Sequence, residues 1–234
     1  MSGINRRLTG TALLLCAVLL SGFGIMIQWE DSNGIKEKIA CMAKQEAVAE
    51  NPKIAITFDD GPDPVWTPQL LDGLKERGAK ASFFLMGKQA EAYPELVLRI
   101  QEEGHLIGNH TYSHIQLNKR NREVFKAELV KTNQLLTKIT GEEIQFVRPP
   151  YGSWDKSLEA ELTMFPVLWT IDPMDWSSSN VSGIVKKVTR EAKENSVILM
   201  HDAYSSSVTA ALEIVDKLQK EGYEFVTVDE LILN

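Results

Sequence analysis

Short runs of apolar, β-branched and aromatic residues alternate with longer amphipathic stretches from Lys53 to the C-terminus. Runs rich in valine, isoleucine and phenylalanine are typical of strands, whereas apolar positions that recur every third or fourth residue predict helices. The expected strands are residues 54–58, 81–86, 105–108, 146–148, 166–170, 196–200 and 225–228. The expected helices are residues 67–77, 91–103, 122–140, 181–194 and 208–221, and four of them are followed by a glycine that can end a helix, at Gly78, Gly104, Gly141 and Gly222.

Strands that alternate with helices predict a parallel sheet, and seven of them suit an incomplete barrel. The expected fold class is therefore α/β, a deformed (β/α)7 barrel formed as a single catalytic domain by residues 53–234. An open doubly wound sheet is the alternative. The barrel is favoured because polar side chains that suit catalysis follow five of the strands, and a barrel brings those strand ends to one mouth. These residues are Asp59, His110, Arg148, Asp172 and His201.

The N-terminal segment predicts a membrane anchor. Residues 8–29 contain no charged side chain, and a helix of about 20 apolar residues spans a bilayer. Arg6 and Arg7 precede this run, and positive charge marks the cytoplasmic side. We therefore expect a single-pass protein of the cell membrane with an extracytoplasmic catalytic domain. Its parts are a cytoplasmic N-terminus at residues 1–7, a transmembrane signal-anchor at residues 8–29, a stalk at residues 30–52 and the catalytic domain at residues 53–234.

A cleaved signal peptide, which would leave a secreted enzyme, is the alternative to this anchor. Such a peptide also begins with positive charge and an apolar run. The first small-x-small sequence that could be cleaved, Ala47-Val-Ala49, lies well beyond the apolar run. Its position favours the uncleaved anchor.

Composition narrows the function further. The 234 residues are 44% hydrophobic, which is enough for one sizeable core. A net charge of −7 offers no basic face, so we expect no nucleic-acid partner. The two cysteines, Cys16 and Cys41, precede residue 53, so the domain that follows has no disulfide and its stability must come from its core.

Two adjacent acids and two spaced histidines are the most informative residues of the chain. Asp59 and Asp60 stand in Thr57-Phe-Asp-Asp-Gly-Pro62, and His110 and His114 are four residues apart. Taken singly, the first motif is typical of a turn, and spaced histidines are common on helix surfaces. However, the chain has only four histidines, and three of them fall in motifs. A carboxylate and two imidazoles leave positions for water and substrate on a hydrolytic metal, so the pattern predicts an enzyme.

Three further loops carry polar and aromatic side chains. Two prolines stiffen Arg148-Pro-Pro-Tyr-Gly152, so that Arg148 can orient a carboxylate such as Asp59. The segments Asp172-Pro-Met-Asp-Trp176 and Val197-Ile-Leu-Met-His-Asp202 add acids, an indole and a histidine. Taken singly, each is typical of an ordinary strand-to-helix loop.

Together and in this order, the five motifs resemble those of the polysaccharide deacetylase family, carbohydrate esterase family four, over residues 53 to about 231. The resemblance implies a catalytic base at Asp59, a general acid at His201, and one divalent ion bound by Asp60, His110 and His114. It implies that the Arg-Pro-Pro-Tyr motif lines the substrate groove and steadies the base, and that Asp175 is the partner of His201. The residues implied to support the site or contact substrate are Arg148, Pro150, Tyr151, Asp172, Asp175, Trp176 and Leu199. The remaining histidine, His105, is expected to be structural.

The function implied by this resemblance is removal of N-acetyl groups from a cell-wall or surface glycan, with N-acetylglucosamine of peptidoglycan as the favoured substrate. Tyr151 supports that sugar, because relatives that act on N-acetylmuramic acid often carry arginine after the two prolines. Chitin oligosaccharides and acetylxylan are the alternatives, since the same residues would act on them. A non-catalytic glycan-binding relative is disfavoured, because such proteins normally lose a ligand, the base or the acid. Zinc is the expected ion, and cobalt and nickel are also compatible with the ligands.

Overall fold

The computed structural model describes residues 51–159 and 161–233. The predicted cytoplasmic segment, the anchor at residues 8–29 and the stalk up to residue 50 lie outside the described residues. Within the part of the chain that is described, no helix has the length and apolar character needed to cross a membrane.

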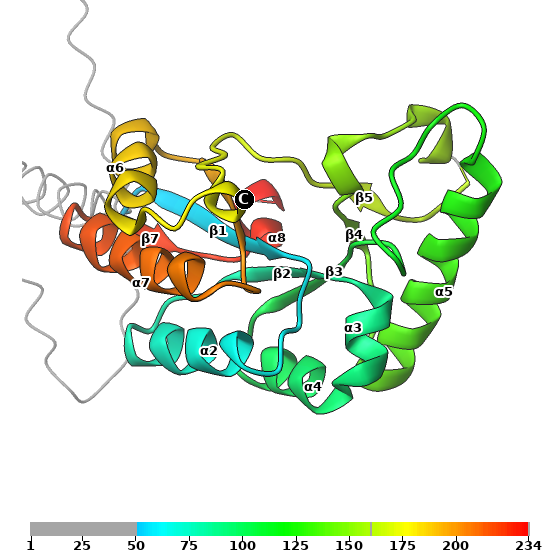
Figure 1. Ribbon diagram of the computed structural model, residues 1–234, viewed down its shortest axis with the longest axis horizontal. Helices are drawn as coiled ribbons and strands as arrows, with labels where there is room; N and C mark the ends of the chain where they lie inside the picture. Colours follow the sequence, from blue (N-terminus) through cyan, green and yellow to red (C-terminus); the bar gives the residue numbers. More distant parts are fainter. Residues whose placement is uncertain (1–50, 160, 234) are drawn as a thin grey trace, which may run out of the picture. The chain divides into compact units, whose positions relative to one another are not determined.

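Seven parallel strands form one sheet, and helices follow them in alternation (Figure 1). The strand order is β5-β4-β3-β2-β1-β6, and β7 pairs with the start of β1. The strands are β1 (Lys53–Asp59), β2 (Ser82–Leu85), β3 (Leu106–Asn109), β4 (Phe146–Val147), β5 (Phe165–Pro166), β6 (Val197–His201) and β7 (Glu224–Phe225). Each overlaps a predicted strand, and the prediction of a parallel α/β sheet is confirmed.

The five predicted helices are present, but one of them is interrupted, and α8 (Val228–Leu233) was not predicted, because its first residue, Val228, was assigned to the strand at residues 225–228. The helices are α2 (Trp66–Glu76), α3 (Gly87–Ala92), α4 (Pro94–Glu102), α5 (Arg122–Thr140), α6 (Val181–Glu191), α7 (Ser205–Lys220) and α8. The predicted helix at residues 91–103 is wrong at its start, because α3 ends before Tyr93 and α4 begins at Pro94. Proline lacks the N–H that would continue α3, but its fixed φ suits the first turn of a new helix.

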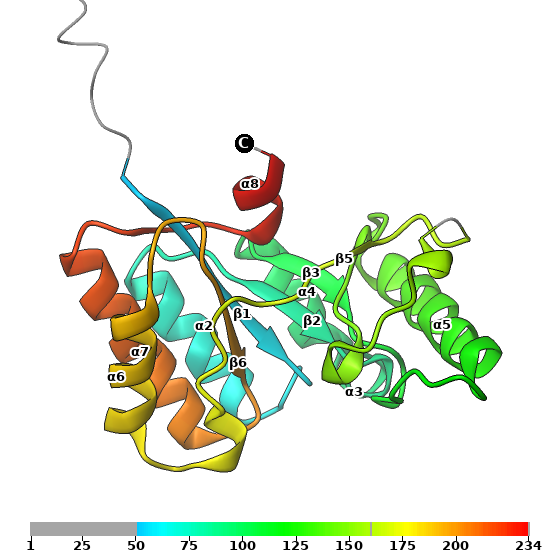
Figure 2. The ribbon, with the colours of Figure 1, turned by 90° about the horizontal axis from the view of Figure 1, so that it is seen from above.

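The period of two along each strand decides which side chains face the site. Ile56 and Phe58 of β1 belong to the main core under the helices. Thr57 and Asp59 alternate with them along the strand, so their side chains lie on the opposite face of the sheet, which we call the inner face. Figure 2 shows α2, α6 and α7 beside one another along β1 and β6. The core therefore fills the outer side of the sheet and leaves polar residues of β1 on the inner side.

An irregular segment crosses the open side of the sheet. Its start is held by β4, because the backbone N–H of Val167 donates to Val147 O at 2.8 Å. Its end is held by β6, because Ile171 forms a parallel bridge with Ile198 and accepts from the backbone N–H of Leu199 at 2.9 Å. The domain is thus an α/β half-barrel of parallel strands, and its outer edges are joined by this crossing rather than by a regular strand.

Candidate active site

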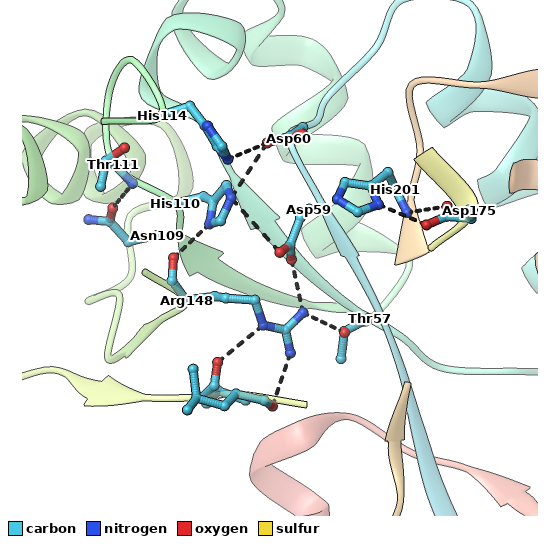
Figure 3. A network of polar contacts seen from close by, with 12 residues as sticks. Thr57, Asp59, Asp60, Asn109, His110, Thr111, His114, Arg148, Asp175 and His201 are labelled. Atoms are coloured by element: carbon cyan, nitrogen blue, oxygen red, sulfur yellow. Dashed lines mark hydrogen bonds and ion pairs between the residues drawn. The ribbon is translucent and has the colours of Figure 1, made fainter. Parts of the chain in front are cut away.

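Asp59 and His201 lie side by side at the C-terminal ends of two neighbouring strands. β1 pairs with β6 in a register that sets Asp59 opposite His201. Both side chains point into the same space in Figure 3. The sheet therefore brings together the two residues that the sequence analysis expected to be base and acid.

Asp60 turns away from the line of β1. Its φ of 73° lies in the left-handed region, so its carboxylate points toward the histidine loop rather than along the strand. Asp60 Oδ1 lies 3.5 Å from His110 Nε2 and 3.4 Å from His114 Nε2. Both adjacent aspartates thus lie near His110, since Asp59 Oδ2 is 3.8 Å from His110 Nε2, but only Asp60 also lies next to His114.

The two histidines stand on a loop, not on a helix. The loop follows β3, and both Thr111 and His114 have positive φ, at 61° and 60°. Asn109 stabilises the turn, because its Oδ1 accepts from the backbone N–H of Thr111 at 2.9 Å while its amide donates to Leu129 O at 2.9 Å. Sequence analysis missed Asn109, whose one signal was a polar residue at the end of an apolar strand.

A backbone carbonyl fixes the tautomer of His110. Nδ1 of His110 lies 2.6 Å from Arg148 O, and a carbonyl only accepts, so Nδ1 carries the hydrogen. Nε2 is then left with its lone pair directed toward Asp60. This arrangement, in which the second ring nitrogen is held by a hydrogen bond, is typical of metal-binding histidines.

The three side chains fit a divalent cation. Ligand atoms of Asp60, His110 and His114 all lie within 4.8 Å of one another. Asp60 Oδ1 is buried and makes no hydrogen bond, although a buried carboxylate oxygen normally has a partner. Burial raises the pKa of Asp60, but the two histidines outweigh it and hold that pKa below its usual range, so the carboxylate is ionised. Burial also lowers the pKa of His114, which keeps that ring neutral and able to bind metal.

Arg148 lies beneath the site and is fully buried. Its Nη1 donates to Asp59 Oδ1 at 2.9 Å and to Thr57 Oγ1 at 2.6 Å, and its Nε donates to Val167 O at 3.1 Å. The guanidinium also lies 4.1 Å from the centroid of the Phe84 ring. Arg148 therefore contacts Asp59 as expected, but the sheet and the crossing segment enclose it, so that Tyr151 is the residue of the Arg-Pro-Pro-Tyr motif that lines the cleft.

Asp175 holds His201 through two hydrogen bonds. His201 Nδ1 lies 2.9 Å from Asp175 Oδ1, and the backbone N–H of His201 donates to Asp175 Oδ2 at 2.9 Å. Burial lowers the pKa of His201, but the hydrogen bond and charge of Asp175 outweigh it and raise that pKa to about 9. The imidazole is therefore protonated at neutral pH, with Nε2 free to donate.

A cleft of about 450 Å³ joins these groups. It is lined by Asp59, Asp60, His110, His114, Tyr151, Trp169, Asp172, Trp176, Leu199, His201 and Tyr204. Of the residues implied to support the site or contact substrate, Arg148, Pro150 and Asp175 are buried and absent from the wall of the cleft. Trp169 and Tyr204 were missed, since an aromatic residue after a strand is by itself only weak evidence for a site.

Asp202, directly after His201, was also missed. Its side chain is fully buried and packs against Gly61. A Cβ added to Gly61 would lie 2.6 Å from the carboxylate oxygens of Asp202. Its Oδ2 accepts from Thr67 Oγ1, and burial raises its pKa to about 7. Asp202 thus packs under the loop that presents Asp59 and Asp60.

Known proteins with similar sequences and folds were found. The family model described as polysaccharide deacetylase matches residues 47–167. Peptidoglycan-N-acetylmuramic acid deacetylase PdaC of Bacillus subtilis is 40% identical over 197 residues, covering 84% of this chain and 42% of that protein. A peptidoglycan-N-acetylglucosamine deacetylase of Bacillus cereus is 39% identical over 186 residues, covering 76% of this chain and 68% of that protein.

The solved structure of peptidoglycan deacetylase PdaC from Bacillus subtilis superposes with a TM-score of 0.75 at 40% identity, covering 77% of this chain and 90% of that chain. The chain spans less than half the length of the first of the two curated relatives.

Proposed function

The chain belongs to the polysaccharide deacetylase family, and on that basis we propose that it is a metal-dependent hydrolase that removes N-acetyl groups from peptidoglycan. The observation that carries the proposal is the register of β1 and β6. It puts a carboxylate and a protonated imidazole, Asp59 and His201, next to a set of metal ligands in one cleft.

Asp60, His110 and His114 would hold the divalent ion, which when bound polarises the acetyl carbonyl and lowers the pKa of water beside it. Zinc suits two imidazoles and one carboxylate, and cobalt and nickel are also compatible. Asp59 accepts the proton of the attacking water, with Arg148 holding the carboxylate in place.

His201 supplies the proton that the departing amine needs. As the bond between the acetyl carbon and the nitrogen breaks, His201 Nε2 gives its proton to the nitrogen, leaving a free amino sugar and acetate. Asp175 makes this possible, because it keeps the ring oriented and protonated. We further propose that a backbone N–H near Tyr151 donates to the oxyanion that develops on the acetyl carbonyl. Leu199 would contact the acetyl methyl group.

Exposed aromatic side chains support a sugar substrate. Tyr151 is 66% exposed and Trp176 is 53% exposed, yet both line the cleft. Large aromatic rings left open to solvent beside a cleft suit stacking on the apolar faces of sugar rings. Tyr151 also favours N-acetylglucosamine as the sugar, since relatives that act on N-acetylmuramic acid often carry arginine at this position.

Chitin oligosaccharides and acetylxylan are the alternative substrates, because they would use the same base, acid and ion. A non-catalytic relative is disfavoured by the complete set of groups, since the function of a fold follows from its site. We also propose that residues 8–29 anchor the enzyme in the cell membrane with the catalytic domain outside. N-terminal sequencing of the membrane-bound protein tests this, and a start near residue 50 in the culture medium would contradict it.

Mass spectrometry of muropeptides incubated with the full-length protein tests the activity. We expect loss of acetyl groups from glucosamine, abolition by a strong chelator and recovery on addition of zinc or cobalt. Chitin and acetylxylan oligomers, run in parallel, distinguish the alternative substrates. Full activity in metal-free protein, or no deacetylation of any of these glycans, would contradict the proposed function.

A further inference from the structure

A second cleft, of about 570 Å³, lies next to the active-site cleft. We call it the cationic cleft, and it is lined by Leu117, Asn118, Lys119, Arg122, Gly152, Ser153, Trp154 and Asp155. One wall is the loop after His114 and the other is the loop after Tyr151, and both of those residues line the active-site cleft. Gln116 Nε2 donates to Ser153 Oγ at 3.2 Å and joins the two loops.

The two clefts open on the same side of the domain. Their loops follow β3 and β4, whose C-terminal ends also carry His110 and Arg148. In a parallel sheet these ends share one edge, so a chain-like substrate that leaves the active-site cleft past Tyr151 reaches the cationic cleft next. A glycan strand is such a substrate.

Positive charge gathers at this cleft in a protein that is acidic overall. Lys119, Arg120 and Arg122 fall within four positions of a chain whose net charge is −7. Arg122 is paired, with Nη2 2.6 Å from Glu161 Oε1. By contrast, the side chains of Lys119 and Arg120 make no hydrogen bond or ion pair with any residue of the described chain.

These charges are not explained by local stability. They precede or begin α5, where the helix dipole disfavours positive side chains by a few tenths of a kcal/mol or more each. Asp155, the acid in the lining, is already engaged, with Oδ1 accepting from the backbone N–H of Ser157 at 2.9 Å and Oδ2 3.9 Å from Arg122 Nε. The free positive charge at the cleft is therefore left for something outside the chain.

An aromatic ring is fixed at the same place. Trp154 Nε1 donates to Glu159 Oε1 at 3.0 Å, and its ring packs edge-on against Phe125 with centroids 6.4 Å apart. A fixed indole in the same cleft as the unpaired Lys119 is a combination suited to a sugar that carries a negative charge.

We propose that the cationic cleft binds a carboxylate carried by the part of the glycan next to the sugar that is deacetylated, with Lys119 as the residue that selects for it. In a peptidoglycan strand that carries its peptides, this carboxylate belongs to the peptide, because the lactyl group of the neighbouring sugar is joined to that peptide as an amide. Where the peptide is missing, the lactyl carboxylate is free instead, and chitin has neither group. The inference rests on the proposed deacetylase function and deepens it, because it makes an anionic strand the preferred substrate.

The test measures kcat/KM of the full-length, zinc-loaded protein on three glycans of equal length. They are peptidoglycan strands with their peptides, the same strands after an amidase has removed the peptides, and an N-acetylglucosamine oligomer. The variants are Lys119→Gln, Lys119→Arg as the conservative replacement, and Lys138→Gln. Lys138 is exposed near the opposite end of α5 and serves as the matched control.

We expect Lys119→Gln to lower the ratio of kcat/KM on strands to kcat/KM on the oligomer by about three- to tenfold, mainly through KM. Lys119→Arg should restore most of the ratio, and Lys138→Gln should leave it at the wild-type value. The preference of the wild type for strands should also weaken at high salt. An effect of Lys119→Gln that is confined to strands with peptides assigns the bound carboxylate to the peptide, and an effect confined to strands without peptides assigns it to the freed lactyl group. An effect on both shows that the cleft accepts either carboxylate.

An equal effect of Lys119→Gln on all three glycans, or none on strands, would overturn the inference while leaving the deacetylase function intact. Failure of the wild type to deacetylate any of the three would instead overturn the proposed function.

Discussion

Replacing Asp175 with asparagine should separate the charge of this residue from its shape. Asparagine has nearly the same size and keeps one oxygen that can accept from His201 Nδ1, but it has no negative charge, and its NH2 group cannot accept from the backbone N–H of His201 as Asp175 Oδ2 does. Burial lowers the pKa of His201 and Asp175 outweighs it, so that the pKa rises from 6.5 to about 9. That rise favours the imidazolium by about 3 kcal/mol.

In Asp175→Asn burial still lowers the pKa of His201, but the charged carboxylate of Asp175, which made the largest contribution to raising that pKa, is gone. The smaller contributions of Asp59 and Asp60 do not replace it, so the pKa of His201 should fall to about 6.5 or lower. At pH 8 the protonated fraction of His201 would then drop from about nine tenths to about three hundredths. Because only the protonated ring can donate to the amine, kcat/KM at pH 8 should fall roughly thirtyfold, with a much smaller loss near pH 6.

The pH profile of kcat/KM on an N-acetylated oligomer measures this shift of the alkaline limb. NMR titration of the metal-free protein measures the pKa of His201 directly, since the chain has only four histidines. His105 serves as an internal control, because it lies elsewhere and should titrate as in the wild type. A His201 that still titrates near pH 9 in the variant, or a loss of activity that is equal at every pH, would refute the reasoning.

The remaining predictions concern the ligands, the buried arginine and the structural histidine. Asp60→Asn should lose bound metal and regain part of its activity at high metal concentration, whereas Asp59→Asn should keep its metal but lose activity by about 10²–10⁴-fold; equal metal contents in the two would contradict these roles. Arg148→Met should lower the free energy of unfolding in urea by roughly 3–5 kcal/mol, because Asp59 would be left buried without its partner, and a loss below about 1 kcal/mol would show that the pair is not needed for stability. Burial lowers the pKa of His105 to about 4, below the usual 6.5 of the unfolded chain. The neutral ring of the folded protein therefore contributes its full stabilisation above pH 6.5, and the free energy of unfolding should fall by about 3 kcal/mol as the pH falls toward 4. The variant His105→Asn should flatten this dependence, and an unchanged slope in urea titrations at pH 4–7 would show that another group is responsible.

Local sequence was sufficient for much of the fold. The alternation along β1, the glycine at φ 75° that ends α5 at Gly141, and the order of strands and helices all follow from side chains that are close in the sequence. The break at Pro94 could also have been predicted, since proline cannot continue a helix. The sequence likewise identified Asp60, His110 and His114 as a group, but only through the resemblance of the five motifs to those of the family, since each motif by itself is typical of a turn or a helix surface.

Only the tertiary structure decided how these groups meet. The register that sets Asp59 opposite His201 depends on packing between strands that are far apart in the chain, and a period of two gives the face of a residue but not its neighbour on the next strand. The burial of Arg148, the support from Asn109 and Asp202, and the second cleft beside Tyr151 depend in the same way on contacts between distant segments. Local patterns thus determined which chemical groups stand at the ends of the strands, whereas the packing of the half-barrel determined which of them touch, which are enclosed and which remain open to a substrate.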